Sequence, residues 1–138
     1  MVLEYLGVAV DEDRLRRILE TTANGTPFSN IERLSALGFF VDYGRQGDVA
    51  LFERSLEVGL PVIVAVETLG WRHWGSEITS HAVVVVGIDQ PSDHIYIHDP
   101  FFANAPLEMG LLEFEVGWEE KRRQYAVIGL AEIGEAHR

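Results

Sequence analysis

The chain has 138 residues, with 22 Asp and Glu against 11 Lys and Arg, and a formal net charge of −11. This charge argues against nucleic acid and anionic lipid as partners, because both are themselves negative. Hydrophobic residues make up 47% of the chain, which is enough to form a folded core. There is no cysteine, which excludes disulfides, thiolate metal sites and a cysteine nucleophile within these residues.

A single domain is expected over residues 1–138, because the length is close to the commonest domain size and no repeat or linker marks a boundary. No run of about 18 apolar residues is present, so we predict no membrane insertion. The start of the chain lacks the pattern of a secretory signal peptide, which favours a cytoplasmic location.

Capping residues and apolar stripes at helical spacing predict helices, mostly in the first half of the chain. They span Met1–Gly7 (the end of a helix), Glu12–Glu20, Ser29 or Asn30 to Leu37, and Val49–Val58. Asp48 is the expected N-cap of the last of these helices, and Gly59 follows its end. A turn followed by a helix is expected over Leu107–Trp118.

Runs rich in Val, Ile, Tyr and Phe predict strands. They span Phe39–Tyr43, Pro61–Glu67, Ala82–Ile88, His94–His98 and Tyr125–Ile133. The Pro61–Glu67 run is apolar on both faces, which is typical of a central strand. Helices come first and a mostly antiparallel sheet follows, which is the pattern of an α+β fold.

The stretch Ser80–Pro100 holds two of these strands, joined by the turn residues Asp89–Asp93. If this hairpin folds symmetrically about Gln90, His81 lies directly opposite Asp99 on the same face of the sheet. A histidine beside a carboxylate is the base and the orienting group of a nucleophilic triad. The alternative is a strand-edge histidine bonded to another neighbour, with the aspartate only starting a turn.

Aromatic residues flank this hairpin in the sequence. Trp71 and Trp74 lie in the loop that precedes it, and Phe101 and Phe102 lie in the loop that follows it. We predict an apolar peptide groove in which Trp71, Trp74 and Phe101 bind substrate, since loops on a rigid scaffold often carry binding groups. The alternative is a loop that its aromatic residues merely anchor to the core.

Neither a metal nor another cofactor is predicted. His94 and His98 share one face of their strand, opposite to the face of Asp99, and no helix carries a pair of histidines four residues apart. Ser80 adjoins His81, but neighbouring strand residues point to opposite faces, so a serine nucleophile is not expected.

Several stretches together resemble a peptidase C39-like domain of the papain-like cysteine peptidase superfamily. They are Met1–Gly7 (MVLEYLG), Thr21–Thr26, Gly59–Glu67, His81–Asp89 (HAVVVVGID) and Ile95–Pro100 (IYIHDP). The resemblance implies a papain-like fold, with N-terminal helices packed on a mostly antiparallel β-sheet. It also implies that His81 is the catalytic general base and that Asp99 orients it.

In that family a cysteine begins the first helix, and a glutamine just before it helps to bind the oxyanion. By the resemblance both positions fall upstream of Met1, the cysteine by about 10 Å of helix, so the domain is expected to be truncated at its N-terminus. The intact parent would hydrolyse peptide bonds with a Cys-His-Asp triad, and the chain as given would be inactive. The alternatives are a peptide-binding pseudo-peptidase and a plain interaction module. An exposed N-terminal region would favour self-association.

Overall fold

A computed structural model of the chain describes residues 12–19 and 27–130, except for the side chains of residues 103–105, and the statements below concern this part. The chain divides into two compact units, one of Met1–Tyr43 with Ala126–Arg138 and the other of Gly44–Tyr125. The expected single domain stays a prediction.

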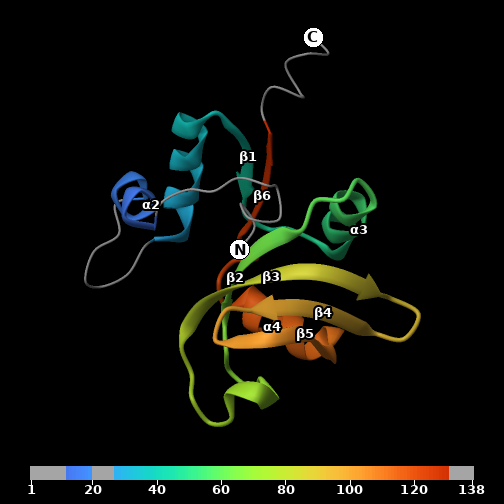
Figure 1. Cartoon of the computed structure of the whole chain (residues 1–138). Helices are drawn as coiled ribbons and strands as arrows, with labels where there is room; N and C mark the ends of the chain where they lie inside the picture. The colour runs from blue at the N-terminus through green and yellow to red at the C-terminus, as the bar shows by residue number, and fades with distance from the viewer. Residues whose placement is uncertain (1–11, 20–26, 131–138) are drawn as a thin grey trace. The chain divides into compact units, whose positions relative to one another are not determined.

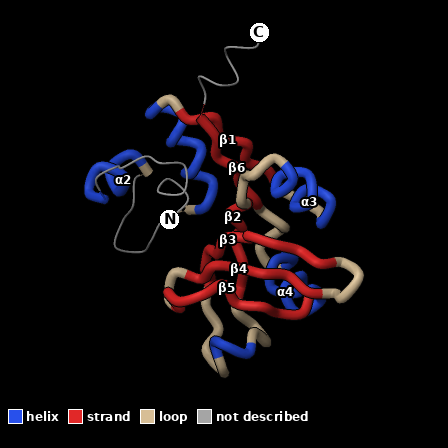
Figure 2. Tube along the Cα trace, turned by 45° about the vertical axis from the view of Figure 1, so that its right-hand side comes forward, coloured by secondary structure: helices blue, strands red, loops and turns tan. Residues whose placement is uncertain are grey.

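The Gly44–Tyr125 unit contains an antiparallel sheet with two helices (Figures 1 and 2). Its strands, in the order in which they pair, are β2 (Val62–Glu67), β3 (Ser80–Asp89), β4 (His94–Asp99) and β5 (Phe102–Gly110). Helix α3 (Val49–Glu57) packs against β2 and β3, and helix α4 (Leu111–Glu119) packs against β2, β4 and β5. Rings from both helices meet, so both helices cover the same face of the sheet.

The core of this unit combines aliphatic strand residues with an aromatic cluster. The fully buried aromatic side chains are Phe52, Trp71, Phe114 and Trp118. The ring of Phe52 lies 4.7 Å from that of Trp118, and the rings of Trp71 and Phe114 stack at 5.9 Å. In β2 the consecutive residues 64–66 are all buried, which requires cover on both faces of the strand, as its sequence predicts.

Helix α3 begins where its capping residue predicts. The side chain of Asp48 accepts a hydrogen bond of 2.9 Å from the backbone N–H of Leu51, which satisfies one of the free N–H groups at the helix start. The helix ends at Glu57, one residue before the predicted end, and Gly59 has φ of 82°, a conformation that favours glycine.

The other unit contains α2 (Glu12–Ile18), the 3-10 helix η1 (Phe28–Leu37), and the neighbouring strands β1 (Phe39–Gly44) and β6 (Tyr125–Leu130). The cap predicted for η1 is wrong: the helix follows Pro27 and has no side-chain cap. The Asn30 side chain instead donates a 2.7 Å hydrogen bond to the carbonyl of Leu19. Gly38, with φ of 88°, ends η1 in the left-handed conformation that glycine allows.

The α+β class is confirmed, with one correction in the second half of the chain. The segment Phe102–Gly110 is strand β5, whereas a loop and then a turn were expected there. Asn104 and Pro106 disfavour a strand, and an edge position tolerates proline because no neighbour needs its N–H. The expected Met1–Gly7 helix and residues 131–133 of the last predicted strand lie outside the described residues.

Across the described ranges, no helix combines the length and the apolar character needed to cross a membrane. The cytoplasmic location inferred from the sequence stays a prediction.

Candidate active site on the β3–β4 hairpin

At the end that carries His81 and Asp99, the β3–β4 hairpin pairs in a register two residues away from the expected one. Val85 pairs with Ile97, whereas folding about Gln90 would have placed Val83 opposite Ile97. The directly opposed pairing of His81 and Asp99 is therefore wrong. Because the offset at this end is an even number of residues, both side chains still lie on one face, as diagonal neighbours.

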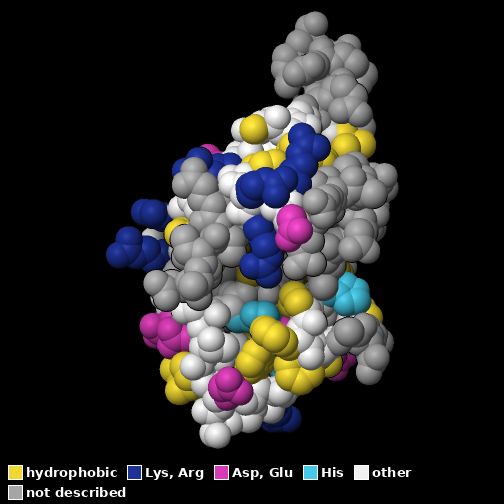
Figure 3. All heavy atoms as spheres, turned by 60° about the vertical axis from the view of Figure 1, so that its left-hand side comes forward, with side chains coloured by type: hydrophobic (Ala, Val, Ile, Leu, Met, Phe, Trp, Pro, Cys, Tyr) yellow, Lys and Arg dark blue, Asp and Glu magenta, His cyan; other side chains and the backbone are white. Residues whose placement is uncertain are grey.

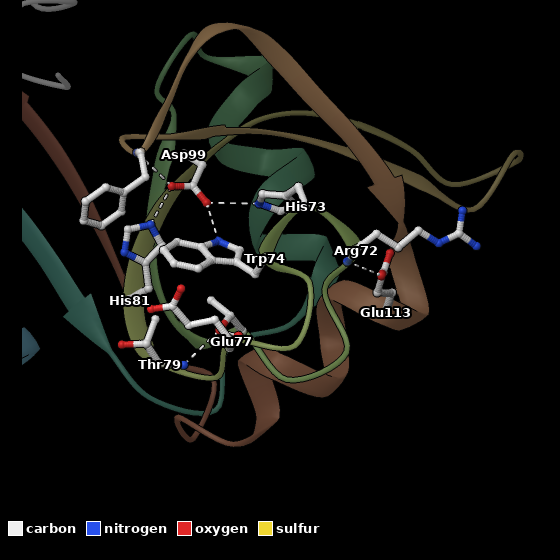
Figure 4. Close-up of polar contacts among 10 residues, drawn as sticks. Arg72, His73, Trp74, Glu77, Thr79, His81, Asp99 and Glu113 are labelled. Carbon is white, nitrogen blue, oxygen red and sulfur yellow. Dashed lines mark hydrogen bonds and ion pairs between the residues drawn. The ribbon is translucent and has the colours of Figure 1, made fainter.

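His81 and Asp99 are nevertheless in contact (Figure 4). His81 Nε2 lies 2.6 Å from Asp99 Oδ1, and the two side chains are 9% and 0% exposed. The His81 ring packs against two aromatic rings, that of Trp74 at 5.1 Å and that of Phe101 at 5.2 Å, which also contact each other. With Nε2 bonded to the carboxylate, Nδ1 is the ring nitrogen left to exchange a proton with another group.

The Asp99 carboxylate is saturated with hydrogen bonds. Its Oδ1 accepts from His81 and from the Phe101 backbone N–H at 3.1 Å. Its Oδ2 accepts from Trp74 Nε1 at 2.9 Å and from His73 Nε2 at 3.1 Å. Burial alone raises the pKa of this carboxyl, but the hydrogen bonds, with that from His81 the strongest, outweigh it and leave the Asp99 pKa below its ordinary value. Asp99 is therefore an ionised carboxylate at neutral pH.

The donors to Oδ2 come from the loop before β3, which contains the short 3-10 turn η2 (Arg72–Trp74). The base of this loop is closed by Thr68, whose hydroxyl donates to the carbonyl of Glu77 at 3.0 Å and accepts from the N–H of Thr79 at 2.9 Å. These contacts explain how a glycine-flanked loop holds two side chains at fixed positions beside the hairpin.

The expected substrate-binding aromatics divide between core and surface. Trp71 is fully buried and stacks on Phe114, so the structure places it in the core and not on the wall of a groove. Phe101 is 72% exposed, and Trp74 lies against it at 5.5 Å. Figure 3 shows hydrophobic side chains gathered beside a histidine on one face of the molecule. Trp74 and Phe101 are thus the predicted residues that lie next to His81.

The remaining polar candidates lie apart from this pair. Ser80 Oγ accepts a hydrogen bond of 2.9 Å from Lys121 Nζ, and no contact links it to His81. His94 bonds Ser92 and lies 3.7 Å from Glu108. Within the described ranges, no group of three or more His, Asp or Glu side chains is arranged to hold a metal ion.

Sequence reasoning missed the roles of His73 and Trp74 as partners of Asp99. The only signal was the adjacency of two N–H-bearing rings in a loop next to the hairpin. Their contact with a residue about 25 positions away depends on how the loop folds back, and strand periodicity carries no information about that.

Comparisons with known proteins identify the family and the fold. The model of the Peptidase C39 family matches residues 1–122. The fold resembles the peptidase domain of Streptococcus ComA, a bi-functional ABC transporter involved in a quorum-sensing pathway, with a TM-score of 0.69 and 23% identity over 93% of this chain and 84% of that one.

It also resembles a C39-like peptidase from Bacillus anthracis, with a TM-score of 0.67 and 18% identity over 92% of this chain and 83% of that one. Among curated proteins no sequence matches the chain. The papain-like α+β fold expected from the sequence is therefore confirmed. Since the family model covers most of its length, the chain belongs to the Peptidase C39 family.

Proposed function

We propose that His81 and Asp99 are the general base and the orienting carboxylate of a cysteine-peptidase site that acts on peptides. The observation that carries the proposal is the 2.6 Å contact between His81 Nε2 and Asp99 Oδ1, with the carboxylate fully buried. A buried carboxylate that accepts from one imidazole nitrogen fixes the tautomer of the ring and stabilises the imidazolium that forms during the reaction.

The chemistry follows from the free nitrogen of the histidine. Nδ1 takes the proton of a cysteine thiol, the thiolate attacks the peptide carbonyl, and Nδ1 then returns the proton to the leaving amine. The 138 residues contain no cysteine. The proposal therefore takes the thiol, with an oxyanion-binding glutamine, from sequence upstream of Met1, and residues 1–138 alone do not hydrolyse peptides.

The substrate class is a peptide with an apolar side chain near the scissile bond. Phe101 exposes most of its ring, and Phe101 and Trp74 both contact His81. Apolar surface beside a catalytic histidine binds a substrate by burying its apolar groups. The net charge of −11 favours peptides that also carry Lys or Arg.

A second candidate is a domain that binds peptides without cleaving them. It is favoured by the lack of any cysteine together with an intact aromatic surface at Phe101. The two candidates differ in one expected result. With a thiol supplied in front of Met1, this second kind of domain would bind peptide but would not hydrolyse it.

The test is an N-terminal extension that places a glutamine and a cysteine ahead of Met1 in helical register. We expect thiol-dependent hydrolysis of apolar basic peptides, abolished by His81→Ala and lowered by up to about 10⁴-fold in Asp99→Asn, the loss known for an orienting aspartate. His94→Ala, which lies away from the pair, is the matched control and retains full rate.

Peptide binding without turnover in the extended protein would favour the second candidate. If the extended protein remains folded but neither binds nor hydrolyses peptides, both candidates are overturned.

A further inference from the structure

The two oxygens of Asp99 are held by two different sets of donors. Oδ1 faces His81 and the Phe101 backbone, whereas the donors to Oδ2 among the described residues are His73 Nε2 and Trp74 Nε1, which are consecutive residues of η2. A carboxylate held through one oxygen can still rotate about its terminal torsion. Fixing the second oxygen prevents this and keeps Oδ1 aimed at the histidine.

The turn that supplies these donors is itself attached to helix α4. Trp71 is buried in the core, and its Nε1 donates a 3.1 Å hydrogen bond to the carbonyl of Glu113. The backbone N–H of Arg72 donates to the Glu113 side chain at 3.2 Å. Figure 4 shows the contact between Arg72 and Glu113 beside the contacts to Asp99. A continuous set of contacts therefore runs from α4 through η2 to the carboxylate.

We propose that Trp71–Trp74 form a clamp for Asp99, in which His73 and Trp74 are positioning residues that hold the carboxylate so that it orients His81. The proposal rests on the proposed function, since orientation matters to catalysis only if His81 is the base. Trp71 and Arg72 fix the clamp to Glu113, and the next two residues fix Asp99. The loop thereby acquires a positioning role in addition to its place in the core.

The two positioning residues differ in chemistry. The indole N–H of Trp74 is a donor at every pH, and the same ring packs against His81. His73 can donate to Asp99 only while Nε2 carries a proton. Its side chain is 17% exposed and faces a cleft whose charged or titratable lining residues are Arg72, His94, Glu108 and Glu113. Trp74 is therefore a donor at every pH, whereas donation by His73 depends on its protonation, and the His73 ring is partly exposed to solvent.

The clamp is tested by NMR on the chain itself, which needs no thiol. A hydrogen-bonded imidazole N–H exchanges slowly with water and gives a low-field proton signal, and here that signal is assigned to His81 Nε2–H by its loss in His81→Gln. We expect the signal in the wild type and its loss through water exchange in the double variant His73→Leu/Trp74→Phe. In His73→Gln, whose amide can still donate to Oδ2, we expect the signal to remain.

The exposed His94, changed in His94→Gln, is the matched control and leaves the His81 signal unchanged. An unaltered His81 signal in a folded double variant would overturn the clamp. If the double variant does not fold, the single variants decide: the signal must weaken in His73→Leu and persist in His73→Gln, and equal signals in the two overturn the proposal. Because no hydrolysis is measured, the outcome is independent of whether the extended protein cleaves peptides.

Discussion

At the scale of single residues, Asp99 holds the candidate site together. Its side chain is fully buried, and its charge is compensated by N–H donors from three segments of the chain: the loop before β3, the start of β3, and the backbone that follows β4. A buried charge is tolerated only when its hydrogen-bonding capacity is met. The stability of the fold and the orientation of His81 therefore depend on the same carboxylate.

Asp99→Asn is expected to lower the free energy of unfolding at pH 7 by about 2 kcal/mol, within the range for a lost charged hydrogen bond. The asparagine NH₂ would face N–H donors whichever way the amide is turned. The folded-state pKa of Asp99 lies below its ordinary value, so its stabilisation is present above the unfolded pKa of about 3.9 and is lost as the pH falls through the lower folded pKa.

Urea unfolding of both proteins from pH 7 down to pH 2 measures this effect. The difference in free energy of unfolding between wild type and variant should be largest at pH 7 and should shrink below about pH 4. Asp89→Asn, at an exposed position on the same hairpin, serves as the control and should unfold at the urea concentration of the wild type. A difference that stays constant down to the lowest pH would contradict the assignment.

At the scale of secondary-structure elements, a glycine sets how closely α4 approaches the end of β2. A Cβ at Gly117 would overlap the carbonyl oxygen of Glu67 and lie 2.8 Å from Trp71 Nε1. Because one of these atoms belongs to the backbone of a core strand, it cannot move aside cheaply. The absence of a side chain at residue 117 is thus what allows Trp71 to pack against the helix.

Gly117→Ala is expected to destabilise the protein by about 1–3 kcal/mol through overpacking. Alanine favours a helix interior by about 1 kcal/mol, so the clash must outweigh this gain. The measurement is the urea midpoint at neutral pH. Gly110→Ala is the matched control, since no atom lies within 4 Å of its added Cβ. It should remain within about 1 kcal/mol of wild type, and a stabilised Gly117→Ala would contradict the close packing.

The elements that sequence patterns predicted well are those with strong local signals. Asp48 marks the start of α3 through its own cap, and the Val-rich run of β3 forms a strand in any register. Strand β5 was missed because its residues are poor strand formers and only pairing with β4 makes them extended. The register of the hairpin was missed as well, because the turn and an irregularity at residues 85–87 set it.

The candidate site was predictable only in part. That His81 and Asp99 share one face of the sheet was predictable, because an even shift in register leaves the face of each side chain unchanged. The contributions of His73 and Trp74 were not predictable, because they depend on the three-dimensional path of a loop. Trp71 was expected at a groove and lies in the core, since a tryptophan looks the same in sequence whether it covers a surface or fills an interior.

At the scale of the whole molecule, charge is the dominant feature. The formal net charge of −11 on 138 residues makes the folded chain repel itself, and the repulsion is strongest in dilute buffer. Ion pairs between exposed side chains contribute little against this because water and salt screen them.

Thermal unfolding at pH 7.5 should therefore occur at a higher temperature in about 0.5 M NaCl than in about 10 mM NaCl. A relief of about 1 kcal/mol corresponds to a rise of roughly 3–6 °C for a chain of this size. Near the isoelectric point of about 4.7 the same addition of salt should have little effect, which is the control. A melting temperature that falls with salt at pH 7.5 would show that local ion pairs outweigh the global repulsion.

The four donors around Asp99 also determine whether this carboxylate can bind a metal ion. Each oxygen of this carboxylate already accepts two hydrogen bonds, so its lone pairs are fully committed. A divalent cation could coordinate it only by expelling an indole or an imidazole from a closely packed interior. Calcium or magnesium in the medium is therefore not expected to bind this carboxylate. The role left to Asp99 is to accept the hydrogen bond of His81, which is the residue proposed to exchange protons.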